Sequence, residues 1–323
     1  MNTQGHYNIL VTGVGAIIGY GIIESLRSSG HDCTIVGADI YEENYGKYIC
    51  DAFEQAPYSN SPGYLDWLSG IVERYSIDLI IPGIEQDLYL YNRHRDKLPA
   101  KTVLNKQQII DLSEDKWATF QFFQSLNAPF IIPTALNIGF DEAVRNYGLP
   151  FIIKPRKSYA SKGFFIIRNE ADYMEHKAGI NENTLFQPCI GSGEEEYTLS
   201  IFGDGKGGFI DKLILRRQLS QEGATSKAFV IKEDPVLEEA AIRIANYIKP
   251  EGPTNLQFRK DRDKAWLLEI NPRISSACSI RSKFGYNEPA FCIEHYLLGG
   301  KYIQRPRKSG KAIRFINDHI VYE

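Results

Sequence analysis

WLLEINPRIS, residues 266–275, joins an apolar run to polar side chains at alternate positions. The run Trp266–Leu268 is typical of a buried strand, and Glu269, Asn271 and Arg273 follow it directly. Because side chains alternate between the two faces of a strand, these three are expected to point the same way. A surface hairpin has no need of a carboxylate, an amide and a guanidinium on one face. The arrangement indicates a site for a metal ion and a phosphate group.

The segment before it, TNLQFRKDRDK at 254–264, predicts a partner strand and a charged turn. Hairpin pairing can set Gln257 opposite Glu269 and Asn271. Carboxylate and amide oxygens are hard ligands of the kind that Mg²⁺ prefers, and substrate phosphates usually complete its shell. We therefore predict a metal site at Gln257, Glu269 and Asn271, and a contact between Arg273 and a transferring phosphoryl group. The alternative is a surface hairpin with alternating polar positions.

Composition is that of a globular protein with room for two or three domains. The chain has 323 residues, of which 43% are hydrophobic and 24% charged, and a net charge of -3. That charge predicts neither a nucleic-acid partner nor a membrane-surface partner. The N-terminus lacks the pattern of a signal peptide, and no apolar run is long enough to span a bilayer. Five cysteines without a CxxC pair favour a reducing compartment, so we predict a cytoplasmic protein.

The first third of the chain alternates strands with helices. YNILVTGVGAIIGYGIIESLRSSG at 7–30 predicts strand, glycine-rich turn and helix, and further buried strands follow at 33–40 and 77–82. This alternation predicts a parallel α/β sheet. A helix is expected to begin near Ser113. After about residue 150 the texture is that of an antiparallel α+β body, with one amphipathic helix at 234–248.

The N-terminal glycines raise a second possibility, a dinucleotide site. Gly13, Gly15 and Gly19 lie between a strand and a helix, and Asp39 ends the next strand. The spacing, however, departs from GxGxxG, because residue 18 is isoleucine. The related short-chain dehydrogenase pattern also fails at Ala16, and its Tyr/Lys pair has no counterpart, since Tyr159 and Lys162 are only three residues apart. A tight turn or a substrate contact is the favoured interpretation.

Basic and small residues follow the apolar strand of LPFIIKPRKSYASKGFFII, residues 149–167. Lys154, at the end of that strand, is suited to a nucleotide phosphate. The loop after it offers backbone N–H groups and hydroxyls that can close over terminal phosphates, at Ser158, Ser161 and Gly163. Taken alone, the loop is equally compatible with a solvated basic hairpin, and Lys116 with an ordinary surface lysine.

TLFQPCIGSGEEEYTLS, residues 184–200, predicts two strands around a turn. Apolar residues and exposed backbone there can flank a purine, with backbone groups near Cys189 and Ile190 reading its edge. Gln187 and Glu196 are then candidates for the exocyclic amine and the ribose hydroxyls. An ordinary hairpin with an acidic turn is the alternative.

Taken in order, these motifs resemble the ATP-grasp superfamily, most closely the large chain of carbamoyl phosphate synthetase and its single-module relatives. The resemblance implies a Rossmann-like pre-ATP-grasp domain at 1–113, followed by ATP-grasp subdomains at 114–186 and 187–323. It implies that ATP is bound by Lys116, Lys154, Ser158, Ser161, Gly163, Gln187, Cys189, Ile190 and Glu196. It further implies one or two Mg²⁺ ions, with Mn²⁺ as a substitute, on Gln257, Glu269 and Asn271. Two departures are Gln187 at the usual hinge acid and a loop rich in serine and lysine.

The function expected from the motifs and the resemblance is an ATP-dependent carboxylate–amine ligase that releases ADP. Its small-molecule substrates are a carboxylate and an amine, its catalytic arginines are Arg273 and either Arg216 or Arg217, with Arg217 preferred, and a homodimer is possible. Arg281, in SSACSIRSKFGYN at 275–287, is a candidate carboxylate binder. The alternatives are a nicotinamide-dependent oxidoreductase or epimerase and a non-catalytic nucleotide-binding protein of the same fold.

Overall fold

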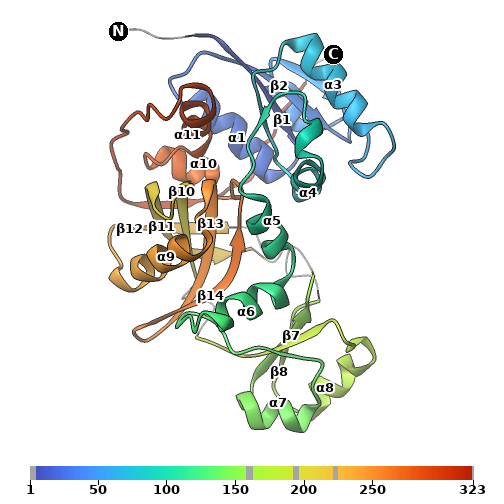
Figure 1. Cartoon of the computed structure of the whole chain (residues 1–323), viewed down its shortest axis with the longest axis vertical. Coiled ribbons are helices and arrows are strands. Elements are labelled where there is room, and N and C mark those ends of the chain that lie inside the picture. The colour runs from blue at the N-terminus through green and yellow to red at the C-terminus, as the bar shows by residue number, and fades with distance from the viewer. Residues whose placement is uncertain (1–4, 158–162, 192–195, 221–224, 322–323) are drawn as a thin grey trace.

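The computed structural model of the chain describes residues 5–157, 163–191, 196–220 and 225–321. They form three β-sheets stacked along the long axis of the molecule, with helices around them (Figure 1). The mixed α/β and α+β character predicted from the sequence is confirmed. The N-terminal sheet is parallel, and the two later sheets are antiparallel.

The N-terminal sheet has the order β3-β2-β1-β4-β5, with every pair parallel. Its apolar strands are buried between layers of helices, as in other doubly wound folds. The strands are β1 Tyr7–Thr12, β2 Cys33–Asp39, β3 Ala52–Gln55, β4 Leu79–Ile81 and β5 Lys101–Thr102. The helices are α1 Ile17–Arg27, α2 Tyr45–Ile49, α3 Tyr64–Tyr75 and α4 Glu85–Arg93.

The largest sheet has six strands in the order β14-β13-β10-β11-β12-β15. They are β10 Glu196–Asp204, β11 Phe209–Leu219, β12 Thr225–Ile231, β13 Glu251–Asp261, β14 Lys264–Asn271 and β15 Lys311–Ile313. The predicted amphipathic helix is confirmed as α9, Pro235–Ile248, which packs on this sheet. Asp234 caps it by accepting the Leu237 N–H at 3.1 Å.

The third sheet is small and has its own hydrophobic core. Its order is β6-β9-β7-β8, from Ala135–Leu136, Thr184–Pro188, Phe151–Pro155 and Phe165–Ile167. Helices α7, Phe140–Tyr147, and α8, Glu170–His176, cover one face. Phe151, Phe186 and Tyr173 are among the residues of this separate core.

Two helices occupy the region where one was expected. They are α5, Gln107–Glu114, and α6, Lys116–Ser125. The break falls at Asp115, whose carboxylate accepts the N–H groups of Trp117 and Ala118 and so caps α6. Ser113 lies in the last turn of α5, so its predicted place at a helix start was wrong. Both helices pack against the six-stranded sheet, through Ile109 and Phe123, while the domain boundary at 113/114 stays a prediction.

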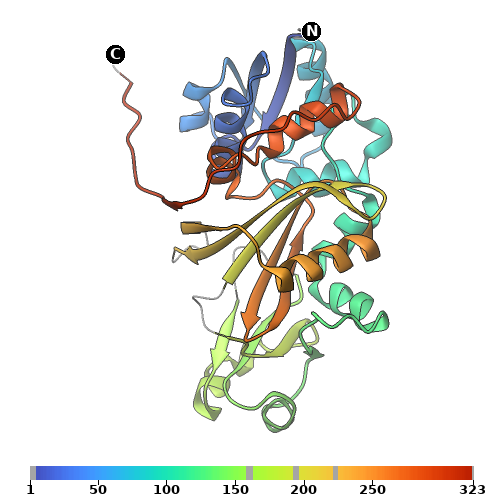
Figure 2. The ribbon, with the colours of Figure 1, turned by 90° about the vertical axis from the view of Figure 1, so that its left-hand side faces the viewer.

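One hydrophobic core joins the N-terminal sheet to the end of the chain. Helix α1 packs on α10, Cys278–Lys283, and α11, Glu288–Cys292, which continues as a π-helix over Ile293–Leu297. Ile22 and Ile23 share a core with Cys278 and Ile293, so residues 274–297 act as a layer of the N-terminal domain. The same arrangement is visible from the side in Figure 2, where the orange and red helices lie against the blue ones.

Gly19, in the first turn of α1, is required by close packing of the glycine-rich turn. A Cβ atom there would lie 2.2 Å from the carbonyl oxygen of Gly13. Gly19→Ala is therefore expected to destabilise the protein by about 2–4 kcal/mol, because backbone has to move. Urea unfolding gives the value. The control is Gly70→Ala in α3, where a Cβ meets open space and stability should rise by about 0.5–1 kcal/mol. Equal stability of the two variants would contradict the assignment.

Candidate active site

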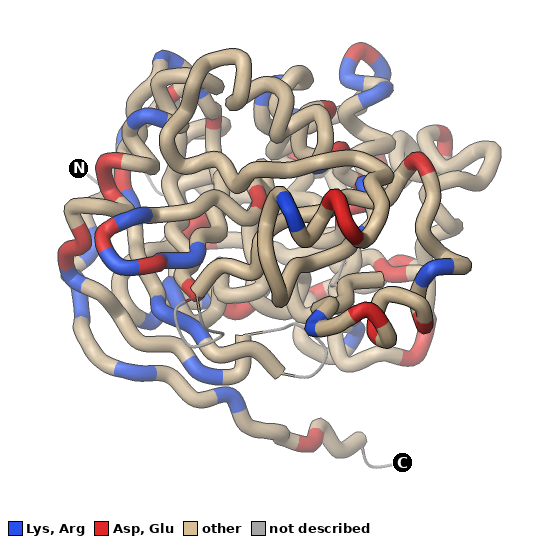
Figure 3. The backbone as a smooth tube through the Cα atoms, turned by 90° about the horizontal axis from the view of Figure 1, so that it is seen from below, with Lys and Arg blue, Asp and Glu red and all other residues tan. Residues whose placement is uncertain are grey.

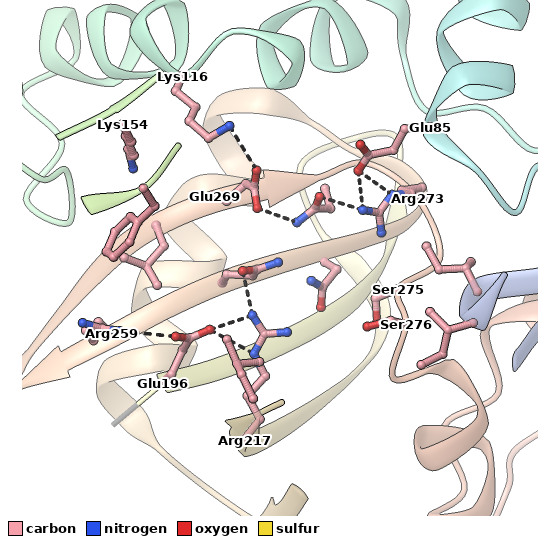
Figure 4. A pocket seen from close by; sticks show the side chains of 18 of the residues that line it. Glu85, Lys116, Lys154, Glu196, Arg217, Arg259, Glu269, Arg273, Ser275 and Ser276 are labelled. Carbon is pink, nitrogen blue, oxygen red and sulfur yellow. Dashed lines mark hydrogen bonds and ion pairs between the residues drawn. The ribbon is translucent and has the colours of Figure 1, made fainter. Parts of the chain in front are cut away.

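A cavity of about 620 Å³ lies where the three sheets meet. The N-terminal domain contributes the start of α1 and the loop before α4, the small sheet contributes β7 and β9, and the large sheet contributes β10, β11, β13 and β14. Figure 4 shows polar side chains from these elements pointing into one space. Eight predicted site residues line it: Lys116, Lys154, Gln187, Ile190, Glu196, Gln257, Glu269 and Asn271, as do the predicted catalytic Arg217 and Arg273.

The floor of the cavity is the β13–β14 hairpin predicted from the sequence. Gln257 pairs in register with Glu269, and Asn255 with Asn271. A β-bulge at Leu268 shifts the register between Gln257 and Phe258, so Leu268 and Glu269 both line the cavity. The bulge explains how an apolar side chain and the candidate metal carboxylate share this wall.

Gln257, Glu269 and Asn271 form a coherent set of oxygen donors. The Asn271 amide lies 3.5 Å from the Glu269 carboxylate, and the Lys116 ammonium lies 3.6 Å from it on the other side. Among the described residues, no group of three or more histidine, cysteine, aspartate or glutamate side chains is placed to hold a metal ion. One carboxylate and two amide oxygens fit a hard cation that also binds phosphate oxygens.

Arg273 lies just after β14 and joins it to the N-terminal domain. It donates to Glu85 at the start of α4, at 3.2 and 2.5 Å, and to the side-chain oxygen of Asn271 at 3.1 Å. Figure 4 shows Glu85 and Arg273 facing each other across the domain boundary. The guanidinium is thus held at the edge of the candidate metal site by groups from both ends of the chain.

Arg217, and not Arg216, faces the cavity. It donates to Glu196 at 2.7 Å and to Gln257 at 2.8 Å, and its side chain is buried. Arg216 is exposed and lies over the Phe229 ring on the other face of the sheet, 5.0 Å from its centroid. The structure therefore settles the choice that the sequence left open.

Glu196 lies between two arginines. Its second oxygen accepts from Arg259 at 3.4 Å, and Arg259 also donates to the Ile190 carbonyl at 3.2 Å. Gln187 donates to Thr134 at 2.8 Å. Cys189, also predicted to face adenine, is not among the residues that line the cavity. Assignment of this hinge to adenine and ribose stays a prediction.

Of the predicted phosphate loop, Ser158 and Ser161 lie outside the described residues. Gly163 has a φ of +73°, and the next residue, Phe164, lines the cavity. A left-handed φ is easily adopted by glycine alone, so Gly163 sets the direction in which the chain enters β8.

Positive charge exceeds negative charge in the cavity, unlike in the whole chain. Its described lining holds five cations, Lys116, Lys154, Arg217, Arg259 and Arg273, against three carboxylates, Glu85, Glu196 and Glu269. Over the molecule as a whole, both signs are interspersed (Figure 3). The excess is therefore local and attracts an anion to this cavity.

Lys154 has an unusual ionisation. Burial, together with the positive charge of Lys116, lowers the pKa of its ammonium from 10.5 to about 8. A bound triphosphate would favour the charged form, so affinity for MgATP is expected to fall as pH rises above 8, by up to about tenfold per unit. Below pH 8 the ammonium is already charged and affinity should be level.

Calorimetric titration of MgATP between pH 6.5 and 9.5 measures this effect. Lys154→Arg is the matched variant, because a guanidinium stays charged over the whole range. Its affinity should be independent of pH. A wild-type affinity that is level up to pH 9.5 would show that Lys154 does not bind the phosphates.

The sequence reasoning missed the part of the site that comes from the N-terminal domain. Ala16, Ile17 and Ile18 at the start of α1, and Gly83 to Gln86 before and within α4, line the cavity. Ligands of open α/β sheets bind beyond the carboxyl ends of the strands. The acidic residue directly after the strand at 77–82 was the available signal for Glu85.

The glycine-rich turn is not arranged for a dinucleotide. The Asp39 carboxylate, which would bind a ribose, accepts the backbone N–H groups of Gly15 at 2.8 Å and Tyr41 at 3.0 Å. It therefore holds the turn closed. The cavity is lined by residues at the start of α1, and Asp39 is not among its lining residues.

Two family models match separate parts of the chain. Residues 9–104 match the PylC-like N-terminal domain, and residues 192–318 match ATP-grasp in the biosynthetic pathway with Ter operon. The family matches and the fold thus agree on an ATP-grasp domain preceded by a PylC-like N-terminal domain. Each model covers less than half of the chain, and the two matches in this order confirm the resemblance to the ATP-grasp superfamily found in the sequence.

Curated relatives and solved structures agree with that. The carbamoyl phosphate synthase large chain of Clostridium perfringens is 24% identical over 309 residues, which are 85% of this chain and 28% of the relative. The chain thus spans less than a third of such relatives. N5-carboxyaminoimidazole synthetase from Staphylococcus aureus with ADP has a TM-score of 0.73 at 18% identity, covering 95% and 82% of the two chains. Biotin carboxylase from Campylobacter jejuni has a TM-score of 0.71 at 16% identity, covering 96% of this chain and 75% of the other.

None of the helices among the described residues is long and apolar enough to cross a bilayer.

Proposed function

We propose that this protein is an ATP- and Mg²⁺-dependent ligase that joins a carboxylate to an amine and produces ADP. The observation that carries the proposal is the cavity floor. Gln257, Glu269 and Asn271 lie together on β13 and β14, between the lysines of one wall and Arg273 of the other. Solved proteins of the same fold were crystallised with ADP or MgADP, which supports a nucleotide in this cavity.

In the proposed reaction, a substrate carboxylate attacks the γ-phosphorus of ATP, which gives an acyl phosphate and ADP. An amine then attacks the acyl carbon and releases phosphate. Lys116 and Lys154 hold the phosphates, and Arg217 and Arg273 stabilise charge on the transferring group. Gln257, Glu269 and Asn271 would hold one or two Mg²⁺ ions, replaceable by Mn²⁺, and such an ion would neutralise the charge of the phosphates. A protein nucleophile is not required.

The nucleotide is proposed to lie between β7, β9 and the bulge at Leu268. Ile152, Ile190 and Leu268 give that end of the cavity apolar walls, which suit a purine. The carboxylate and amine then occupy the opposite end, near the starts of α1 and α4. Glu85 and Gln86 line that end. A carboxylate and an amide would not be expected in a site that binds phosphate through cations alone.

The test is a screen for ADP release. Purified protein with MgATP is given amino acids and sugar acids as carboxylates, with and without amine acceptors. An increase in ADP that needs both substrates supports the ligase. MgATP binding without turnover on any pair would favour the non-catalytic alternative. A homodimer is also proposed, because a biotin carboxylase domain of this fold was solved as a dimer, and analytical ultracentrifugation measures it.

A further inference from the structure

A buried arginine lies directly behind the substrate end of the cavity. Arg281, on α10, is 0% exposed and is not part of the lining, so the prediction that it contacts a carboxylate itself was wrong. Its guanidinium donates to the side-chain oxygen of Asn255 at 2.7 Å and to the hydroxyl oxygen of Ser275. Asn255 and Ser275 do line the cavity.

Arg281 decides which atoms of Asn255 face the ligand. A guanidinium has only donors, so the amide oxygen of Asn255 must turn toward it, and Thr198 donates to the same oxygen. The amide NH₂ is left on the cavity side. Among the described residues it has no hydrogen-bond acceptor, although Asn255 is only 1% exposed.

The same holds for Ser275. Its hydroxyl oxygen accepts from Arg281 and from the Ala277 N–H at 3.2 Å. With both acceptor positions used, the hydroxyl proton remains to be donated, and within the part of the chain that the structure describes nothing accepts it. Two neutral donors of one polarity thus face the cavity.

Glu288 holds the arginine in place. It lies 3.5 Å from Arg281, is 0% exposed, and accepts from Ser200 at 2.7 Å. The start of α1 adds to the same wall, since Ala16, Ile17 and Ile18 line it and Ala16 provides no side-chain cap. This helix has 11 residues, and the N-terminus of a helix favours negative charge.

We infer that Arg281 is a positioning residue that fixes Asn255 and Ser275 as donors for an anionic oxygen group at the substrate end of the cavity. The inference rests on the proposed function. It identifies the group bound at this end as a carboxylate or the transferring phosphate, and not as an ammonium. A cation would meet two N–H or O–H hydrogens and be repelled.

The test uses orthophosphate as the probe and variants that keep the net charge. Thermal unfolding of the full chain is followed against phosphate concentration. Arg281→Lys keeps the charge but loses the planar fork whose two nitrogens bond Ser275 and Asn255, and should raise the half-maximal phosphate concentration about tenfold. Ser275→Ala removes one donor and should have a similar effect. Ser200→Ala is the control, because it lies in the same buried network without lining the cavity, and should remain within about twofold.

Binding of MgATP, binding of MgADP and competition by acetate distinguish the possible outcomes. If the anion is the γ-phosphate, Arg281→Lys weakens MgATP binding and leaves MgADP binding unchanged. If it is a substrate carboxylate, both nucleotides bind as in wild type and acetate competes with phosphate. The inference would be overturned if phosphate did not stabilise the wild-type protein. It would also be overturned if Arg281→Lys and Ser275→Ala left the phosphate effect unchanged, or if Ser200→Ala weakened it equally. Absence of MgADP binding in wild type would refute the proposed function alone.

Discussion

Replacing Glu269 with alanine is expected to lower substrate-dependent ADP release at least about a thousandfold while leaving the fold intact. Glu269 is the carboxylate of the proposed metal set, and the two amides beside it carry no charge. Its side chain is one-third exposed and contacts Lys116 and Asn271 at the cavity wall, so its removal opens no gap in a hydrophobic core. Loss of activity should therefore come without a loss of stability.

Steady-state ADP release at several Mg²⁺ concentrations measures the effect, and Glu269→Gln separates charge from shape. Glutamine keeps an oxygen ligand, so its activity should recover in part at high Mg²⁺. Glu251→Gln is the control, since Glu251 is on the same sheet near His295 and away from the cavity. Undiminished turnover in Glu269→Ala would refute the assignment of Glu269 as a metal ligand.

Arg273→Met is expected to reduce kcat by about a hundredfold to a thousandfold and to leave the affinity for MgADP nearly unchanged. The guanidinium lies just after β14, beside Asn271. In the proposed reaction, negative charge moves at this place during phosphoryl transfer. An interaction that strengthens in the transition state lowers kcat when it is lost. ADP has no γ-phosphate and should bind as before.

Comparison with two other variants makes this result specific. Arg243→Met removes an exposed arginine that pairs with Glu239, and should behave as wild type. Glu85→Gln removes the strongest partner of Arg273 and keeps the guanidinium, so its effect on kcat should be smaller. If Arg273→Met retained more than a third of wild-type kcat, a role for Arg273 in the transfer step would be refuted.

Local patterns were sufficient to predict the hairpin at the cavity floor. Alternation along a strand puts Glu269 and Asn271 on one face, and the structure pairs Gln257 with Glu269 as expected. The bulge at Leu268 could not be predicted, because an extra residue in one strand has no distinctive sequence signal here. Likewise Arg216 and Arg217 alternate faces, and only the strand pairing shows which face is inside.

Contacts between distant segments account for the rest of what was missed. Glu85 and Arg273 are 188 residues apart in the chain, and neither sequence neighbourhood indicates the other. Arg281 was predicted to be a binding residue because it is charged and follows β14 closely in the sequence. Its burial depends on α1 and α11, which cover it from other parts of the fold. The order of motifs revealed the class of protein, but not which side chains touch.

The core shared by α1 and residues 274–297 has a consequence for protein synthesis. A ribosome makes the parallel sheet first, yet the apolar face of α1 is covered only by helices translated about 250 residues later. During that interval Ile22 and Ile23 are exposed to other nascent chains. The N-terminal domain is therefore expected to keep an uncovered apolar face until translation is nearly finished. A nonsense mutation before residue 274 would release an aggregation-prone polypeptide, although all five strands of its first sheet were complete.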